Sequence, residues 1–318
     1  MQLKRLSSTE SSIPFHFFVT MKNLIVIVGP TAIGKTSLSI AIAKHFKCDI
    51  ISADSRQFFK EMAIGTAKPT TTELAEAPHH FISNKSIDQK YSAGTFEIEA
   101  IAKLKELHKT NDVAILVGGS GLYVNAVCDG IDDIPFDLEV REQLNKELEE
   151  LGAKPLREEL KEKDPEHYAR MNTKNPQRLV RAIEVCRITG KTYSSFRKNT
   201  VKKRDFNIIK IGLNTDREVV YNRINQRVDL MMEEGLLDEV KSLEKNKDLN
   251  ALNTVGYKEL FAYLDDEQTL EEAVDLIKQH TRNFAKRQLT WFKKDRTTNW
   301  FEPNKLNDIL NYLDKEIN

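Results

Sequence analysis

Four residues that could bind a phosphorylated ligand follow a run of apolar side chains in the spacing G-x-x-x-x-G-K-[ST]; they are Gly29, Gly34, Lys35 and Thr36. In this spacing, backbone N–H groups surround an anion at the N-terminus of a helix, the lysine adds a positive charge, and the threonine hydroxyl can bind Mg²⁺. A chance glycine loop is disfavoured because a strand-like run precedes the motif and apolar residues at helical spacing follow it. The motif predicts a diphosphate or triphosphate ligand without indicating which.

Asp54 is the second residue that could do chemistry. It follows residues 48–52, which have the composition of a short strand. Ligands bind at the carboxyl ends of the strands in an open α/β sheet, so we expect Asp54 to face the phosphate loop. The alternative is that Asp54 only caps a helix or forms a turn.

Several common kinds of site are disfavoured. Residues 113–117 predict a buried strand that ends in Gly118 and Gly119, where a typical P-loop ATPase has an acidic residue for Mg²⁺. His79 and His80 are adjacent, so on a strand they point to opposite faces and do not share a metal ion. The three cysteines form no C-x-x-C pair, which predicts no zinc site or disulfide and favours a cytoplasmic protein.

Composition limits the partners. The 318 residues contain 48 Lys plus Arg and 48 Asp plus Glu, so the net charge is zero and a nucleic-acid partner would need a local basic patch. No apolar run reaches the roughly 20 residues of a membrane helix. We expect no membrane association, no obligate protein partner and a monomer.

One local basic run exists. Between residues 170 and 204 there are eleven basic residues and one acidic residue, Glu184, a charge of 11 − 1 = +10. Within it, Asn175 and Pro176 predict the start of a helix and Gly190 its end. Solvated charges on an exposed helix are the alternative, but so one-sided a run favours contact with a phosphate backbone. The basic residues are Arg170, Lys174, Arg178, Arg181, Arg187, Lys191, Arg197, Lys198, Lys202, Lys203 and Arg204.

Strand-like and helical segments alternate, which predicts an α/β fold with a P-loop NTPase-like parallel sheet core and a helical insertion domain. We assign residues 21–131 and 206–318 to the core and 132–205 to the insertion, and we expect residues 1–20 to be a disordered leader. Arg223 and Arg227 are four apart and share a helix face. Residues 281–294 predict a basic helix whose apolar stripe contains Ala285, Leu289 and Phe292.

Taken in order, the motifs resemble those of the tRNA dimethylallyltransferases (tRNA isopentenyltransferases), over nearly the whole chain from Met21 onward. Any one of these motifs alone would be weak, whereas the ordered series is specific. The matching segments are residues 29–36 (GPTAIGKT), 51–57 (ISADSRQ), 64–69 (IGTAKP), 78–80 (PHH), 118–123 (GGSGLY), 175–181 (NPQRLVR), 255–258 (VGYK) and 285–292 (AKRQLTWF).

The resemblance implies transfer of a dimethylallyl group from dimethylallyl diphosphate to N6 of the adenosine 3′ of the anticodon, position 37 of the tRNA. It places Asp54 and Thr31 in catalysis, with Asp54 accepting the N6 proton, and Mg²⁺ at Thr36. The diphosphate would contact Gly29, Pro30, Thr31, Ala32, Ile33, Gly34, Lys35, Thr36, Arg223 and Arg227, although which arginine matters more stays open. The anticodon stem-loop would contact Asp54, Ser55, Arg56, Gln57, Ser120, Arg141, Gln177, Arg178, Leu179, Val180, Arg181, Asn253, Thr254, Val255, Gly256, Tyr257, Lys258, Lys286, Arg287, Gln288, Trp291 and Lys293.

Three other functions compete. An adenylate isopentenyltransferase acts on a free nucleotide and needs neither the basic insertion nor the basic C-terminal helix. A small-molecule P-loop kinase is disfavoured by the missing acid at the strand end. An RNA-binding module with a vestigial loop is disfavoured because Lys35, Thr36 and Asp54 are all present.

Overall fold

A parallel β-sheet forms the centre of the computed structural model, which describes residues 21–171, 175–198 and 200–317; the predicted leader, residues 1–20, lies outside the described residues. The strand order is β3-β2-β4-β1-β5-β6, and all neighbours pair in parallel. This arrangement confirms the predicted fold class. The strands are β1 (Asn23–Val28), β2 (Ile50–Ser52), β3 (His79–His80), β4 (Val113–Val117), β5 (Asn207–Leu213) and β6 (Asn299–Phe301).

The central strand β1 explains why both sheet faces are covered. All six of its residues are buried, and successive side chains point to opposite faces. Ile25 and Ile27 join one core cluster, whereas Leu24, Val26 and Val28 join another. A continuous apolar run is therefore compatible with a strand only because helices pack on both sides of it.

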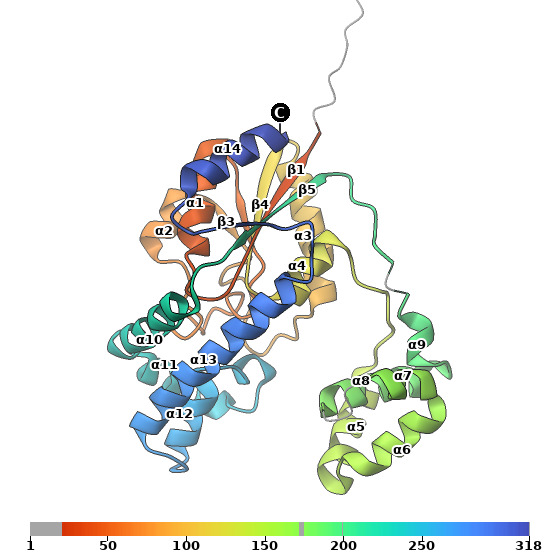
Figure 1. The fold of residues 1–318 in the computed structure, drawn as a ribbon. Coiled ribbons are helices and arrows are strands. Elements are labelled where there is room, and N and C mark those ends of the chain that lie inside the picture. Colours follow the sequence, from red (N-terminus) through yellow and green to blue (C-terminus); the bar gives the residue numbers. More distant parts are fainter. Residues whose placement is uncertain (1–20, 172–174, 199, 318) are drawn as a thin grey trace, which may run out of the picture.

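The helices form two layers around the sheet (Figure 1). Residues of α1, α10 and α14 join the first cluster, and residues of α3 and α4 join the second. The helices of the core are α1 (Lys35–Phe46), α2 (Thr71–Glu76), α3 (Ala93–Leu107), α4 (Gly121–Cys128), α10 (Arg217–Glu233), α11 (Leu236–Ser242), α12 (Tyr257–Leu264), α13 (Leu270–Phe292) and α14 (Leu306–Ile317), with short 3₁₀ turns at Glu244–Asn246 and Asn250–Leu252.

A third cluster joins α10, α11, α12 and α13 to the loop after β2. Leu236, Tyr257 and Leu260 pack there against Phe59 and Met62 of that loop. The sequence analysis assigned all of residues 206–318 to the α/β core, so this separate helical layer was not anticipated. Nor was the full length of α13, whose N-terminal capping box on Thr269 lies twelve residues before the predicted start.

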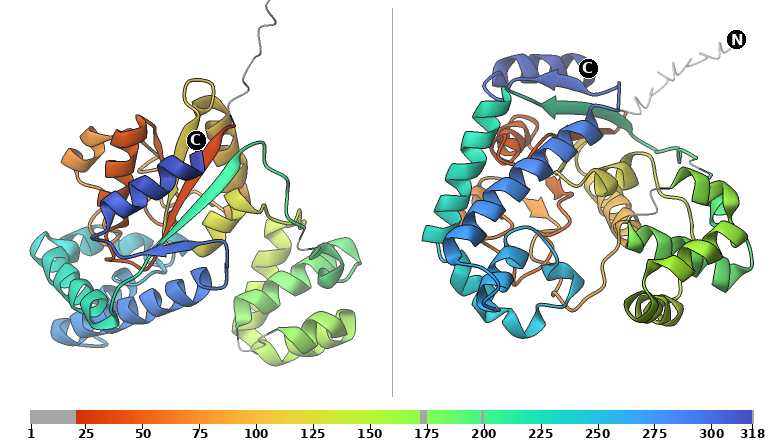
Figure 2. Two further views of the ribbon diagram at one scale, coloured as in Figure 1. Left: turned by 45° about the horizontal axis from the view of Figure 1, so that its top comes forward. Right: turned by 60° about the horizontal axis from the view of Figure 1, so that its bottom comes forward.

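Residues 138–196 form a group of helices that lies to one side of the sheet, joined to it by two connections (Figures 1 and 2). They pack around a core of their own, which includes Leu144, Leu160, Leu179 and Ile183. The helices are α5 (Leu138–Leu151), α6 (Ala153–Lys163), α7 (Pro165–Arg170), α8 (Pro176–Thr189) and α9 (Tyr193–Phe196).

Helix α8 begins and ends as its sequence predicts. The Asn175 side chain accepts a hydrogen bond from the backbone N–H of Arg178, Pro176 occupies the first turn, and Gly190 follows the helix with φ 68°. Lys174, part of the basic run, lies outside the described residues. No helix in the described part of the chain is long and apolar enough to cross a membrane.

Candidate active site

The phosphate loop lies between β1 and α1, at the carboxyl edge of the sheet. Gly29 has φ 152°, and a Cβ atom there would lie 2.8 Å from the Leu213 carbonyl oxygen of the neighbouring strand. Gly34 precedes α1 with φ 103°. Both conformations disfavour any residue with a side chain, so these two glycines are required by the path of the loop.

Lys35 is held inside this loop. Its Nζ donates hydrogen bonds to the carbonyl oxygens of Pro30 (2.8 Å) and Gly29 (3.1 Å). Burial lowers the pKa of Lys35 to about 8, the Asp54 carboxylate opposes that shift, and the Arg227 guanidinium adds to it. Residues from three elements therefore share one electrostatic environment, with Asp54 facing the loop across β4 as expected.

The two arginines of α10 are placed differently. Arg223 is exposed, and its guanidinium donates a long hydrogen bond of 3.5 Å to the Ile33 carbonyl. Arg227 is partly buried, its pKa is lowered by burial, and its charge acts on Lys35. The sequence analysis left open which of the two arginines matters more for the diphosphate, and this geometry favours Arg227.

Asp54 follows the last residue of β2 by two positions. Its Oδ1 accepts a hydrogen bond from the backbone N–H of Arg56 at 3.0 Å, so the turn-forming role considered for Asp54 is present. The other carboxylate oxygen is not needed for that turn, so Asp54 can form the turn and also accept a proton from a substrate. Next to it, the backbone N–H of Ser55 and the Ser120 hydroxyl are 3.0 Å apart, which joins the ends of β2 and β4.

Gln288 has a position that the sequence analysis did not predict. Its side chain is buried; Oε1 accepts from the backbone N–H of Thr31 at 2.8 Å, and Nε2 donates to the Gly119 carbonyl at 2.9 Å. We predicted a tRNA contact at Gln288, but its amide instead joins the phosphate loop to the loop after β4. One signal was available: Gln288 is three residues after Ala285 and four before Phe292, both on the buried side of α13.

Several other predicted tRNA contacts have side chains that are buried or hydrogen-bonded within the protein. Leu179 and Val180 lie in the core of the insertion, because α8 turns this face toward α5 and α6. Tyr257 is fully buried, and its hydroxyl donates to Glu239 at 2.6 Å. Gln57 donates its side-chain amide to the carbonyls of residues 66 and 67.

Glu239, which the sequence analysis did not single out, arranges this region. Its carboxylate accepts hydrogen bonds from the backbone N–H groups of Ala63, Ile64 and Gly65 at 2.8–3.0 Å, in addition to the Tyr257 hydroxyl. A single acidic residue on α11 therefore fixes the 64–69 loop against α12. The sequence around Glu239 contains no pattern that predicts this role.

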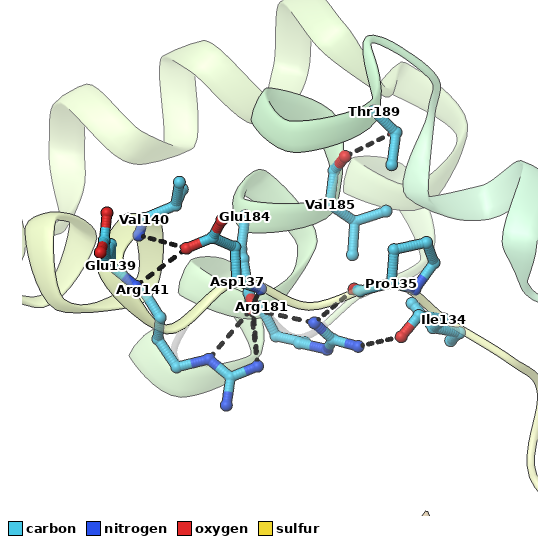
Figure 3. A network of polar contacts seen from close by, with 10 residues as sticks. All are labelled: Ile134, Pro135, Asp137, Glu139, Val140, Arg141, Arg181, Glu184, Val185 and Thr189. Atoms are coloured by element: carbon cyan, nitrogen blue, oxygen red, sulfur yellow. Dashed lines mark hydrogen bonds and ion pairs between the residues drawn. The ribbon is translucent and has the colours of Figure 1, made fainter.

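Arg141 and Arg181 were predicted to contact tRNA, but both point toward Glu184, whose side chain is fully buried (Figure 3). Arg141 donates to both carboxylate oxygens, and Arg181 donates to one of them and to the carbonyls of Ile134 and Pro135. Removing either arginine would leave a buried charge undercompensated. The Arg181 guanidinium holds the first connection onto the insertion through the Ile134 and Pro135 carbonyls.

Part of the basic run at residues 170–204 is neutralised in the structure, because acidic residues distant in the sequence pair with some of its members. Contact of the run with a phosphate backbone stays a prediction. Arg187 pairs with Glu147 and Glu159, and Lys202 and Arg204 pair with Glu97. Arg178 remains exposed, and no ion pair involving it occurs within the described ranges 21–171, 175–198 and 200–317.

The remaining predicted RNA contacts are at least partly accessible, apart from Gly256, which is buried at the start of α12. Trp291 is 41% exposed and approaches Asn125 through its indole N–H. The exposed or partly exposed positions are Gln177, Asn253, Thr254, Val255, Lys258, Lys286, Arg287 and Lys293.

Comparison of the chain with protein-family models identifies its family. The model of the family described as IPP transferase matches residues 57–295, which is most of the chain. The chain belongs to the IPP transferase family. Among similar proteins, the tRNA dimethylallyltransferase of Flavobacterium johnsoniae is 54% identical over 301 residues, covering 92% of this chain and 97% of that protein. The one from Bacteroides fragilis is 49% identical over 300 residues, covering 94% and 100%.

Solved structures of the family extend the comparison. The tRNA isopentenylpyrophosphate transferase from Bacillus halodurans has a TM-score of 0.69 and 38% identity, covering 93% of this chain and 97% of that chain. A eukaryotic dimethylallyltransferase acting on tRNA has a TM-score of 0.72 and 26% identity, covering 90% and 75%. These matches confirm the resemblance found in the sequence.

Proposed function

We propose that this IPP transferase family member transfers the dimethylallyl group of dimethylallyl diphosphate to N6 of the adenosine at position 37 of tRNA. Transfer of a dimethylallyl group to tRNA agrees with the names of its relatives. The observation that carries the finer proposal is that Asp54, at the end of β2, is close enough to the phosphate loop for its charge to act on Lys35. An anion-binding loop and a carboxylate at one edge of the sheet suit a reaction that releases diphosphate and a proton.

In this reaction the N6 lone pair forms a bond to C1 of the dimethylallyl group while the C1–O bond to the diphosphate breaks. The electron pair of that bond leaves with the diphosphate, and Asp54 accepts the proton from N6. Lys35 and Arg227 stabilise the negative charge that increases on the diphosphate. Gln288 acts as a positioning residue, because it orients the loop without touching the reacting atoms. Thr31 stays a predicted catalytic residue.

Mg²⁺ is part of the proposal, bound at Thr36. In the described residues no three His, Cys, Asp or Glu side chains gather into a metal-binding group. A magnesium ion would be held by diphosphate oxygens, water and the Thr36 hydroxyl at the start of α1, a set that suits an ion which keeps several waters. When bound, it supplies charge neutralisation on the diphosphate.

Acceptor binding would involve Arg178, Lys258 and the basic residues at the end of α13, which are exposed on α8, α12 and α13. These helices lie on the two parts of the molecule that face each other in Figure 2. An RNA hairpin between them would contact both. A free nucleotide would not need the insertion, so we propose the anticodon stem-loop as the acceptor.

The donor can be tested by calorimetry with dimethylallyl diphosphate and with ATP, followed by transfer to an anticodon stem-loop RNA. We expect binding of dimethylallyl diphosphate and N6-modified adenosine in the RNA, measured by mass analysis of nucleosides. Tight ATP binding with steady phosphate release, and none of dimethylallyl diphosphate, would refute the proposal in favour of a kinase.

A further inference from the structure

The hydrogen bonds that begin at Glu239 continue beyond the 64–69 loop toward the active site. Glu239 lies on α11, and its side chain is partly buried. Its carboxylate accepts from three successive backbone N–H groups, those of residues 63–65, and successive N–H groups of this kind form a concavity that binds an anion. The Tyr257 hydroxyl donates to the same carboxylate. Four donors therefore meet one acidic side chain, to which the mechanism above assigns no role.

The carbonyl groups of the 64–69 loop hold Gln57. The side-chain amide of Gln57 donates to the Thr66 carbonyl at 3.2 Å and to the Ala67 carbonyl at 3.1 Å. Ala67 has φ 47°, a left-handed conformation that residues with a side chain rarely adopt, so the surrounding contacts must keep the loop in this shape. Glu239 contributes to that restraint, because it binds the N–H groups directly before these two carbonyls.

Gln57 is also attached to the strand that precedes Asp54. Its Oε1 accepts a hydrogen bond from the Ser52 hydroxyl at 3.3 Å. Ser52 is the last residue of β2, so Ser52 and Gln57 stand at the two ends of the turn formed by residues 53–56. The turn that carries Asp54 is therefore closed by a side chain that the 64–69 loop holds in place.

The phosphate loop is held by a different set of contacts. The side-chain hydrogen bonds of Glu239 and Gln57 described above go to residues 52, 63–67 and 257. Gln288, in contrast, binds the phosphate loop through the backbone N–H of Thr31. A change at Glu239 should therefore disturb the position of the proton acceptor and leave donor binding as it is.

We propose that Glu239 is a positioning residue for the proton transfer. Through the 64–69 loop and Gln57 it keeps the Asp54 carboxylate where the N6 proton is accepted, and it acts through these residues rather than on the reacting atoms. A proton acceptor must lie within hydrogen-bond reach of the proton that it takes, so a small displacement of the turn reduces the rate. The inference rests on the proposed function, in which Asp54 is that acceptor.

The test combines Glu239→Gln with Asp54→Asn and measures single-turnover transfer from dimethylallyl diphosphate to an anticodon stem-loop RNA. Glu239→Gln keeps the length of the side chain but replaces one acceptor oxygen by an amide nitrogen, which cannot accept from a backbone N–H. Alone, it should slow transfer about 10- to 100-fold, since a displacement of about 1 Å can cost on the order of 10²-fold. The dissociation constant of dimethylallyl diphosphate, measured by calorimetry, should not change.

The double variant separates positioning from a structural role. In protein that carries Asp54→Asn, Glu239→Gln should cause almost no further loss of rate, because the position of residue 54 no longer matters once the proton acceptor is absent. Gln57→Leu is a second variant that breaks the same path but leaves the four hydrogen bonds of Glu239 in place. It should also slow transfer only where Asp54 is present, and it decides the question if Glu239→Gln fails to fold.

Asp238→Asn is the matched control, because Asp238 precedes Glu239 on α11 and its side chain is 85% exposed. It should transfer at the original rate. An equal loss from Glu239→Gln in the presence and absence of Asp54, or a lowered melting temperature with an unchanged rate, would refute the positioning role. Failure of the proposed function is seen separately, as absence of dimethylallyl transfer by the unmodified protein.

Discussion

At the scale of single residues, the site depends on opposite charges held close together. Asp54 raises the pKa of Lys35 against the larger effect of burial, which lowers it to about 8. The carboxylate therefore keeps more of Lys35 in its charged form than burial alone would allow. The two predictions at this scale separate the role of the carboxylate in proton transfer from its effect on the loop.

Asp54→Asn should slow transfer by about 10²–10⁴-fold in single-turnover experiments, because the proton acceptor is lost while the shape of the side chain is kept. The loss should appear in kcat rather than in the affinity for tRNA. Asparagine supports a turn about as well as aspartate, so the melting temperature should not change. The assay belongs at a pH of about 7, where Lys35 stays mostly charged. A variant that melts normally and transfers at the original rate would exclude Asp54 as the general base.

Donor affinity should fall as the pH rises above about 8, the pKa of Lys35. Below that pH the Lys35 ammonium is charged and attracts the diphosphate; above it the proton is lost, and the dissociation constant should rise by up to about 10-fold per pH unit. Titration calorimetry with dimethylallyl diphosphate alone checks this expectation. Lys35→Arg keeps its charge and should show a nearly flat profile over the same range. A flat profile in the unmodified protein would contradict the lowered pKa.

At the scale of elements, α13 contributes to both the donor site and the acceptor site, whereas the sequence analysis assigned its residues to tRNA contact alone. One face carries the exposed Lys286, Arg287 and Lys293, whereas the opposite face places Gln288 against the phosphate loop. The same helix can thus adjust the donor site and contact the acceptor. Variants on its two faces should affect different substrates.

Gln288→Leu should weaken donor binding about 10-fold, because it leaves the Thr31 N–H and the Gly119 carbonyl without their buried partner. Affinity for the stem-loop RNA should stay unchanged. Gln288→Glu is the informative second variant, since it keeps the acceptor for Thr31 but places an oxygen against the Gly119 carbonyl. If Gln288→Leu weakened RNA binding and spared the donor, the original prediction of a tRNA contact would be right and the positioning role wrong.

At the scale of the whole molecule, the insertion is held to the core through two buried or nearly buried carboxylates. Glu97 of α3 accepts from Lys202, Arg204 and the backbone N–H of Ile131, so it binds both connections at the core end. Glu184 holds the first connection at the insertion end through Arg181 (Figure 3). The position of the insertion relative to the sheet therefore depends on these ion pairs.

Arg178 and Arg181 of α8 should respond differently to alanine. Arg178→Ala should flatten the slope of log K for tRNA against log salt by about one unit, because an exposed arginine that contacts a phosphate releases a counterion. The melting temperature of the Arg178→Ala variant should not change. Arg181→Ala should keep the salt slope but lower the melting temperature, since it removes a partner of the buried Glu184. An unchanged slope in Arg178→Ala would place the RNA contact elsewhere.

The sequence by itself determined the parallel α/β fold, the phosphate loop and the helix ends at Asn175 and Gly190. The phosphate loop and the helix ends depend on local backbone conformation and on short spacings, so a few neighbouring residues specify them. The fold class follows from the alternation of strands and helices along the chain. The position of Asp54 was also predictable, because the order of strand, turn and polar residue places it at the carboxyl edge of the sheet.

Only the tertiary structure decided what many polar residues of the helices do. Gln288 and Arg181 lie among basic residues in the sequence, yet each turns toward a partner distant in the chain or toward a buried acid. Leu179 and Val180 share a motif with exposed residues but face a core formed by α5 and α6. A helix presents successive side chains about 100° apart, so the elements that pack against it decide which residues bind a substrate and which hold the fold.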